Sequence, residues 1–279
     1  MYKLIIGASG YLGKAINNQL KQHGYKVLGY KSKTKSPSYK FSLDQLNFID
    51  ELEDVDEVIL TAGISGKAVS LNPSLSYKIN VENTKKSIDE FTRKNIFINF
   101  ISSSAVFNIQ QNLAHEDDLP KPLSLYGQQK LIIENYLIDK CVNGNKFRII
   151  RPTKVLSLES NIIAAWLNKS ELSDDIEINP TIKIAPISLK SFVDSLLKIL
   201  MSDTFGTFHL SGAETINLID LINALQAKKF FIKDPSIKIS ESYFDDNASI
   251  LGMQKTLEKV GIKPQTCKNF YNDLFLFNL

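Results

Sequence analysis

The fold is decided near the N-terminus by the stretch Lys3-Leu4-Ile5-Ile6-Gly7-Ala8-Ser9-Gly10-Tyr11-Leu12-Gly13. The short apolar run over residues 3–6 predicts a buried strand, and the amphipathic residues 12–22 predict a helix. Gly7 permits a tight turn between them, Gly10 lets the backbone approach a phosphate, and Gly13 allows the helix to pack closely on the strand. The helix N-terminus adds N–H groups and partial positive charge. This combination predicts a turn that binds the pyrophosphate of a dinucleotide.

The rest of the chain continues the alternation of short apolar runs with helix-length amphipathic segments. Further strands are predicted over residues 26–29, 57–61, 97–101 and 147–150, and further helices over 81–94 and 126–142. After residue 152 the alternation is less regular, with a helix predicted over 189–201, a strand over 206–210 and a helix over 218–227. Repeated strand–helix units favour a parallel sheet. We therefore expect an α/β protein, a Rossmann-type doubly wound parallel sheet with a smaller, partly interleaved C-terminal lobe.

The same pattern suggests two domains. We predict a dinucleotide-binding domain over residues 1–155, to which later segments near 184–212 return. The remainder, residues 156–279, is predicted to form a smaller substrate-binding lobe.

Composition argues against several classes of function. The 33 basic residues are scattered among 30 acidic ones, and the net charge is only +3, so no nucleic-acid partner is expected. Cys141 and Cys267 stand far apart without a CxxC pair or a neighbouring histidine, which argues against a zinc site or a disulfide framework. The sequence shows no signal-like N-terminus and no apolar run of about 18 residues. We expect a cytoplasmic protein with no bound metal and no membrane partner.

A candidate catalytic pair stands at Tyr126 and Lys130. Residues four apart share a helix face, so the ammonium can lie beside the phenol, and a nearby cation favours the phenolate. Such a phenol can serve as a general acid or base near neutral pH. Tyr136 and Lys140 repeat the spacing. They lie about 80° around the helix and about 15 Å along it, so only one pair can face a given ligand.

Three features together resemble the extended branch of the short-chain dehydrogenase/reductase superfamily, the NAD-dependent epimerase/dehydratase family. They are the Gly-x-x-Gly-x-x-Gly turn, the Tyr-x-x-x-Lys pair and the serine run at residues 102–104. The resemblance selects Tyr126 over Tyr136, because Tyr126 follows a proline-containing segment and lies 23 residues after Ser103. It also assigns the catalytic hydroxyl to Ser103, four residues before Phe107, with Ser102 and Ser104 as the alternatives in register.

The resemblance implies a set of site residues over the first 154 positions. The implied catalytic residues are Ser103, Tyr126 and Lys130, and the implied substrate contacts are Ser103, Ser104, Tyr126 and Lys154. The implied cofactor-binding residues are Gly7, Ser9, Gly10, Tyr11, Leu12, Gly13, Lys31, Ala62, Gly63, Asn80, Tyr126, Lys130 and Pro152. For Asn80 an N-cap role is the structural alternative. The later His209 is interpreted as a packing residue.

The cofactor is expected to be NADP(H). An acidic side chain after the second strand would bind the adenosine ribose and favour NAD, but residues 27–33 contain no acid. Lys31 or Lys33 could instead pair with a 2′-phosphate. NAD(H) stays open as the alternative, and which of residues 42–44 faces the adenine is also open.

The favoured function is an NADP(H)-dependent reductase of a keto group on a nucleotide-activated deoxysugar, of the kind used in polysaccharide biosynthesis. The chain most resembles nucleotide-sugar 4-ketoreductases of the dTDP-4-dehydrorhamnose reductase type. Family dehydratases carry acids directly after the catalytic hydroxyl, where this chain has Ser104-Ala105. An NAD-dependent nucleotide-sugar epimerase is the alternative. A non-catalytic NADP-sensing regulator is a lesser one, since Ser103, Tyr126 and Lys130 are all retained. Family members commonly form homodimers, so a homodimer is also expected.

Overall fold

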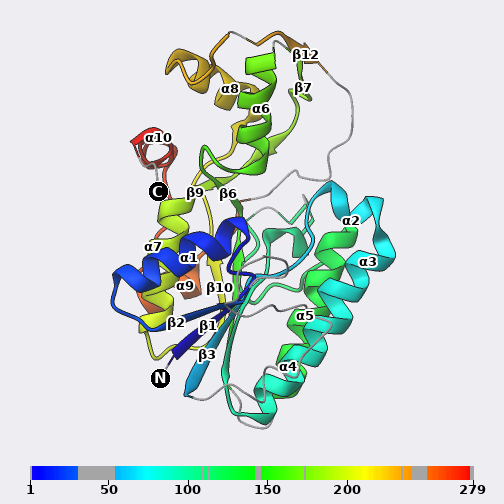
Figure 1. Ribbon diagram of the computed structural model, residues 1–279, viewed down its shortest axis with the longest axis vertical. Coiled ribbons are helices and arrows are strands. Elements are labelled where there is room, and N and C mark those ends of the chain that lie inside the picture. The colour runs from blue at the N-terminus through cyan, green and yellow to red at the C-terminus, as the bar shows by residue number, and fades with distance from the viewer. Residues whose placement is uncertain are drawn as a thin grey trace.

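Figure 1 shows a computed structural model, which describes residues 2–30, 54–108, 110–111, 113–141, 146–172, 174–233, 235–239 and 250–276. Within these residues the central sheet has six parallel strands in the order β10-β5-β4-β3-β1-β2. They are β1 (Tyr2–Ile6), β2 (Val27–Tyr30), β3 (Val55–Leu60), β4 (Phe97–Ile101), β5 (Phe147–Pro152) and β10 (Gly206–Leu210). The predicted parallel sheet is confirmed, with β3 starting two residues earlier and β5 ending two residues later than expected.

The strand order reverses at β1, which lies between β2 and β3. In open α/β sheets, ligands bind outside the carboxyl ends of the strands at such a switch point. The glycine-rich turn follows β1 directly, so the fold places it where a ligand is expected.

Helices cover both faces of the sheet (Figure 1). One face carries α1 (Tyr11–Gln22), α7 (Leu189–Met201) and α9 (Gln254–Val260), which pack on side chains such as Ile5 and Ile59. The other face carries α4 (Thr84–Arg93) and α5 (Leu125–Cys141), which pack on Leu4 and Val58. Helices therefore bury mostly apolar strand side chains on both faces of the sheet, which explains the largely hydrophobic runs in the sequence.

The helix predicted over residues 81–94 has a more complex start. A π-helical turn, η2 (Lys78–Asn83), precedes α4, and two short helices, α2 (Lys67–Leu71) and α3 (Pro73–Tyr77), precede that turn. π-Helical turns are rare and occur often at functional sites. Within the described residues, no helix is long and apolar enough to span a membrane.

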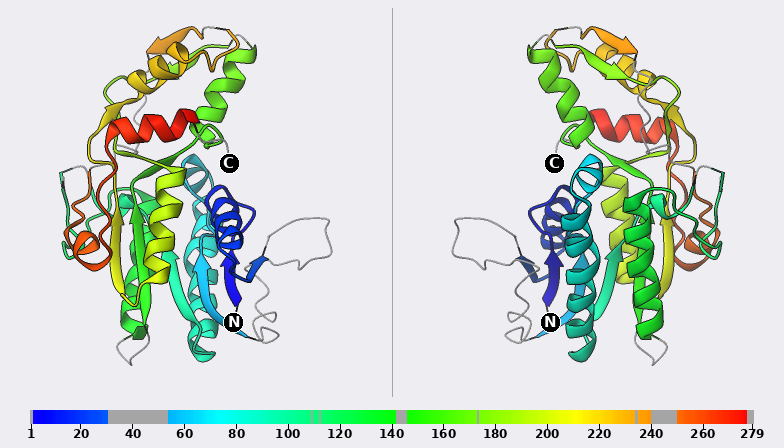
Figure 2. Two further views of the ribbon diagram at one scale, coloured as in Figure 1. Left: turned by 90° about the vertical axis from the view of Figure 1, so that its left-hand side faces the viewer. Right: turned by 90° about the vertical axis from the view of Figure 1, so that its right-hand side faces the viewer.

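A second lobe lies beyond the carboxyl ends of the strands (Figures 1 and 2). Its hydrophobic core includes Ile163, Trp166, Leu221 and Phe270. Its helices are α6 (Asn161–Leu172), α8 (Leu218–Ala227) and α10 (Cys267–Leu276). Its strands form two pairs, β7 (Ile176–Ile178) with β12 (Ile237–Ile239), and β8 (Lys183–Ile184) with β11 (Ile216–Asn217).

The lobe is interleaved with the sheet domain, as predicted. The chain enters the lobe after β5 through β6 (Lys154–Leu156), and returns through β9 (Pro186–Ser188) to α7 and β10. β6 and β9 pair in parallel, so the outgoing and returning segments lie side by side. The domain boundary at residue 155 stays a prediction.

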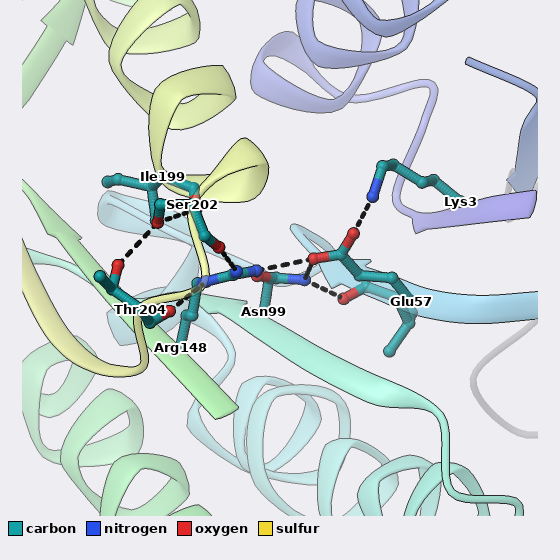
Figure 3. A network of polar contacts seen from close by, with 8 residues as sticks. Lys3, Glu57, Asn99, Arg148, Ile199, Ser202 and Thr204 are labelled. Carbon is teal, nitrogen blue, oxygen red and sulfur yellow. Dashed lines mark hydrogen bonds and ion pairs between the residues drawn. The ribbon is translucent and has the colours of Figure 1, made fainter. Parts of the chain in front are cut away.

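A row of buried polar side chains crosses the sheet near the amino ends of its strands (Figure 3). Glu57 of β3 accepts hydrogen bonds from Arg148 Nη1 and Asn99 Nδ2, each at 2.8 Å, and pairs with Lys3. Arg148 is 4% exposed and Asn99 is 0% exposed. Arg148 also donates to the carbonyls that follow α7, those of Ser202 at 2.6 Å and Thr204 at 2.8 Å. This arginine therefore joins the sheet to the carboxyl end of α7.

Candidate active site

The glycine-rich turn forms a tight cradle at the end of β1. Gly7 has a φ of 95°, and a Cβ there would lie 2.6 Å from Thr61 Oγ1 and 2.7 Å from Ala62 N. A Cβ on Gly13 would overlap the carbonyl of Gly7. The first turn of α1 has no side-chain cap, so ligand oxygens can bind its N–H groups. The turn therefore fits the pyrophosphate of a dinucleotide.

Gly13→Ala should weaken dinucleotide binding by about tenfold or more, because the added Cβ pushes the cradle apart. Overpacking of this kind costs about 1–3 kcal/mol, and about 1.4 kcal/mol is a factor of ten in affinity. Fluorescence titration with NADPH and NADH measures the effect. Gly24→Ala is the control for a general loss of stability, since Gly24 has a φ of 79° that strains alanine, while a Cβ there meets no atom within 4 Å. Equal affinity of Gly13→Ala and the unsubstituted protein would refute this role for the turn.

Tyr126 and Lys130 lie on the first turns of α5, beside the carboxyl end of β4. Tyr126 is half-buried and Lys130 is buried, 8% exposed. The Lys130 ammonium donates to the Ile101 carbonyl at 2.8 Å and lies 5.7 Å from the centroid of the Tyr126 ring. Burial lowers the pKa of Lys130 to about 8, and the negative charge of Glu134 opposes that shift. Lys130 is therefore mainly cationic at neutral pH, beside the phenol.

The three serines that follow β4, residues 102–104, have different environments. Ser102 is buried and its hydroxyl donates to Glu134, so this hydroxyl points into the protein interior. Ser103 is half-buried and caps a short 3-10 turn, η3 (Ser104–Val106), with Oγ accepting from Ala105 N at 3.2 Å. Ser104, the first residue of η3, is also half-buried. Of the register alternatives, Ser102 is the one withdrawn from a ligand.

Close packing brings η3 against the start of α5. A Cβ on Gly127 would overlap the Ala105 carbonyl and lie 2.9 Å from Pro122 Cβ. Tyr126 directly precedes Gly127, and Ser103 lies two residues before Ala105, so both side chains belong to the same end of the sheet. The requirement for glycine at residue 127 was not anticipated from the sequence, although the Tyr-Gly pair is its visible signal.

Asn80 clamps the segment that follows β3. Its Oδ1 accepts from Ile64 N at 2.7 Å, and its Nδ2 donates to the Ile64 carbonyl and to Gln129 Oε1, each at 2.8 Å. Asn80 lies inside the π-helical turn η2 rather than before a helix, so the N-cap alternative is wrong. Through Gln129 it ties the segment carrying Ala62 and Gly63 to α5, and no sequence pattern had selected Gln129.

The remaining predicted residues surround this region or lie outside the described residues. Tyr11 donates from its hydroxyl to Ser157 Oγ at 3.0 Å, which links the glycine turn to the loop after β6. Pro152 is buried at the end of β5, and Lys154 begins β6. Leu12 packs against the core on the α1 face, whereas Ser9 and Gly10 are exposed. Lys31, Lys33 and residues 42–44 fall outside the described residues.

The second Tyr–Lys pair has a structural role. Tyr136 donates from its hydroxyl to Asp89 Oδ1 at 2.6 Å, and Lys140 Nζ pairs with the same oxygen at 2.7 Å. Asp89 belongs to α4, so this pair fastens α5 to α4. The interpretation of Tyr136 and Lys140 as structural is confirmed.

His209 is fully buried, and both of its ring nitrogens have hydrogen-bond partners. They are Gly252 O at 2.8 Å and Arg151 Nη1 at 3.3 Å. Burial and the charge of Arg151 lower the pKa of His209 to about 4, so the ring is neutral at physiological pH. Its interpretation as an interior residue is consistent with this geometry. Among the described side chains, no cluster of three or more His, Cys, Asp or Glu could hold a metal ion.

A parallel sheet in this strand order, with a glycine cradle at its switch point, defines a dinucleotide-binding α/β protein of the Rossmann type. Residues 3–182 match the model of the NAD dependent epimerase/dehydratase family, and the chain belongs to that family.

The chain is also similar to individual proteins that carry different names. Methionine adenosyltransferase 2 subunit beta from Pongo abelii is 23% identical over 238 residues, 80% of this chain and 70% of the relative. UDP-glucuronic acid 4-epimerase from Bacillus cereus, solved with UDP-glucuronic acid and NAD, has a TM-score of 0.83 at 18% identity, covering 98% of this chain and 99% of that one. A hypothetical dTDP-4-dehydrorhamnose reductase from Sulfolobus tokodaii has a TM-score of 0.76 at 23% identity, covering 92% and 94%. These structural likenesses show the fold.

Proposed function

We propose that this protein is an NADP(H)-dependent reductase of a keto group on a nucleotide-activated deoxysugar. The observation that carries the proposal is the placement of Tyr126 and Lys130 beside the Ser103 turn, at the strand ends next to the glycine cradle. Family membership supports nicotinamide chemistry. The solved epimerase and reductase of similar fold support a nucleotide-sugar as the substrate class.

In this proposal each catalytic side chain has one task. A bound nicotinamide supplies the hydride. Tyr126 donates its proton to the carbonyl oxygen as negative charge develops there, and Ser103 donates a hydrogen bond that orients the same oxygen. Lys130 stays cationic beside the phenol and stabilises the phenolate that remains after proton transfer. The Ile101 carbonyl holds the ammonium in place at 2.8 Å.

The preference for NADP(H) is supported by the sequence after β2. Residues 27–33 contain two basic candidates for pairing with a 2′-phosphate, Lys31 and Lys33, and no acid that would bind a free ribose hydroxyl. The epimerase of similar fold was solved with NAD, which keeps NAD(H) as the alternative. Titrating the protein with both cofactors decides between them.

An NAD-dependent epimerase is the second candidate. The family name and the solved UDP-glucuronic acid 4-epimerase favour it. Such an enzyme would retain NAD through purification and interconvert two sugars without net use of cofactor. A regulatory subunit is a third candidate, supported by the similarity to methionine adenosyltransferase 2 subunit beta. The retained Tyr126, Lys130 and Ser103 argue against it.

Initial rates with dTDP- and UDP-linked 4-keto-6-deoxyhexoses test the proposal. We expect oxidation of added NADPH that depends on the sugar, with a slower rate for NADH. Tightly bound NAD with no oxidation of added NADPH would overturn the reductase in favour of the epimerase. Cofactor binding without turnover of either kind would favour the regulatory subunit.

A further inference from the structure

Glu134 places a buried carboxylate one helical turn beyond Lys130 on α5. It is 0% exposed. Arg151 of β5 binds it in a two-pronged contact, Nη2 to Oε2 at 2.7 Å and Nε to Oε1 at 3.0 Å, and the Ser102 hydroxyl donates to Oε1. Buried ion pairs are tolerated only where their remaining hydrogen-bonding groups are satisfied. No buried side-chain polar atom in the described residues lacks a partner, so this condition is met.

The partners of Glu134 lie at the ends of the two strands that carry the candidate site. Ser102 directly precedes Ser103, and Ser102 N donates to the Ile150 carbonyl at 2.7 Å. Arg151 directly precedes Pro152. Because Lys130 donates to the Ile101 carbonyl, α5 is fastened to the end of β4 at two points on successive helical turns. Removing the Glu134 carboxylate would release the point nearer to Ser103.

The charged and polar groups that face Lys130 in the described residues come from α5, β4 and β5. On α5 these are Tyr126 and Glu134, and from β4 come the Phe100 ring, 4.6 Å from Nζ, and the Ile101 carbonyl. From β5 comes Arg151, which is paired to Glu134.

Behind Arg151 stands the ring of His209 in β10, which is neutral because burial and the charge of Arg151 lower its pKa to about 4. Arg151 Nη1 also lies 3.5 Å from the Glu116 carbonyl, and the Glu116 carboxylate is held separately by Thr256 N and Oγ1. Among the described groups packed around Lys130, the Glu134 carboxylate is therefore the negative charge that opposes the lowering of the Lys130 pKa by burial.

We propose that Glu134 is a positioning residue: its carboxylate fixes the Ser102–Ser103 end of β4 against α5 and places a negative charge one helical turn from Lys130. Its effect on catalysis rests on the proposed function. Its effect on Lys130 is a property of the protein alone and can be measured without a substrate.

The chain offers a matched control at the opposite end of the same sheet. Glu57 is also a buried carboxylate paired with an arginine of β5, Arg148, at 2.8 Å (Figure 3). Glu57→Gln and Glu134→Gln therefore remove the same group from the same kind of pair. A merely structural role predicts that both variants lose stability and that neither changes Lys130 specifically.

The deciding experiment is an NMR titration of protein labelled with carbon-13 at the lysine ε-carbon, with the Lys130 signal assigned by its loss in Lys130→Arg. We expect Glu134→Gln to move the titration midpoint of Lys130 down by about one pH unit, because the attraction of an opposite charge is lost. Glu57→Gln should leave the titration midpoint of Lys130 unchanged. An unmoved Lys130 in Glu134→Gln, or an equal shift in Glu57→Gln, would overturn the proposal.

A second variant covers the case in which Glu134→Gln leaves Arg151 unpaired and does not fold. Glu134→Gln combined with Arg151→Met removes both buried charges, which is often tolerated. Lys130 should still titrate at lower pH in this variant, but the shift should be smaller than in Glu134→Gln, because the positive charge of Arg151 is removed together with the carboxylate.

Once a nucleotide-sugar substrate is identified, Glu134→Gln should lower kcat about tenfold to a hundredfold. The affinity for NADPH and the KM for the sugar should stay nearly unchanged. The loss should be larger at alkaline pH, and Glu134→Asp should restore part of it by returning the charge. A fall in affinity alone, with kcat unchanged, would contradict the proposed role. If no nucleotide-sugar is reduced at all, the proposed function fails, while the titration of Lys130 still decides the role of Glu134.

Discussion

Tyr126→Phe should lower turnover by about a hundredfold to ten-thousandfold, the range that general acid–base catalysis contributes. The substitution removes only the hydroxyl, and Lys130 keeps its hydrogen bond to the Ile101 carbonyl, so the fold and the cofactor cradle should be unaffected. Steady-state rates and an NADPH titration on the same preparation measure the two quantities. We expect nearly unchanged cofactor affinity.

Tyr136→Phe is the matched control, because it removes the same atom from the same helix with the same spacing to a lysine. It loses the 2.6 Å hydrogen bond to Asp89 and should cost about 1 kcal/mol of stability with full activity. Equal activity losses in the two variants would mean that Tyr126 is not the proton donor.

Arg148→Met should lower the free energy of unfolding by about 3–5 kcal/mol, the usual cost of breaking a buried ion pair by removing one partner. Glu57 would lose the guanidinium at 2.8 Å, and the two carbonyls after α7 would lose their donor. Urea unfolding measures the change. A loss of this size is a large fraction of the stability of a typical domain.

Two variants test the cause of that loss. Arg93→Met removes an exposed arginine paired with Glu90 at 2.8 Å and should cost less than about 1 kcal/mol. Adding Glu57→Gln to Arg148→Met should recover part of the loss, since the buried carboxylate that lost its guanidinium is then removed, although Lys3 loses its partner. If Arg148→Met unfolds no more easily than Arg93→Met, the buried row does not stabilise the sheet.

The sheet could be predicted from sequence because its signals are local. Apolar runs such as residues 3–6 and 97–101 are short, are buried on both faces, and are separated by helices with clear periodicity. The glycine turn is local as well, and the steric reason for Gly13 is contact with Gly7 only six residues away. The pairing of Tyr126 with Lys130 follows from helix geometry alone.

The supporting contacts could not be predicted, because they join residues that are distant in sequence. Glu134 reaches Ser102 and Arg151 across 32 and 17 positions, and Arg151 reaches His209 across 58. No spacing rule selects such pairs, since the order of strands in the sheet must be known first. Gln129 illustrates the same limit, because its partner Asn80 is 49 positions away.

Deuterium transfer from the cofactor to the sugar is the most direct test of the proposed reaction. Wild-type protein is mixed with a nucleotide-linked 4-keto sugar and NADPH carrying deuterium at both positions of nicotinamide C4, and the product sugar is analysed by mass spectrometry. We expect a reduced sugar that carries the deuterium, formed at a rate that falls by about a hundredfold or more in Tyr126→Phe. A product without deuterium, or equal rates of transfer in the two proteins, would contradict the proposed reaction.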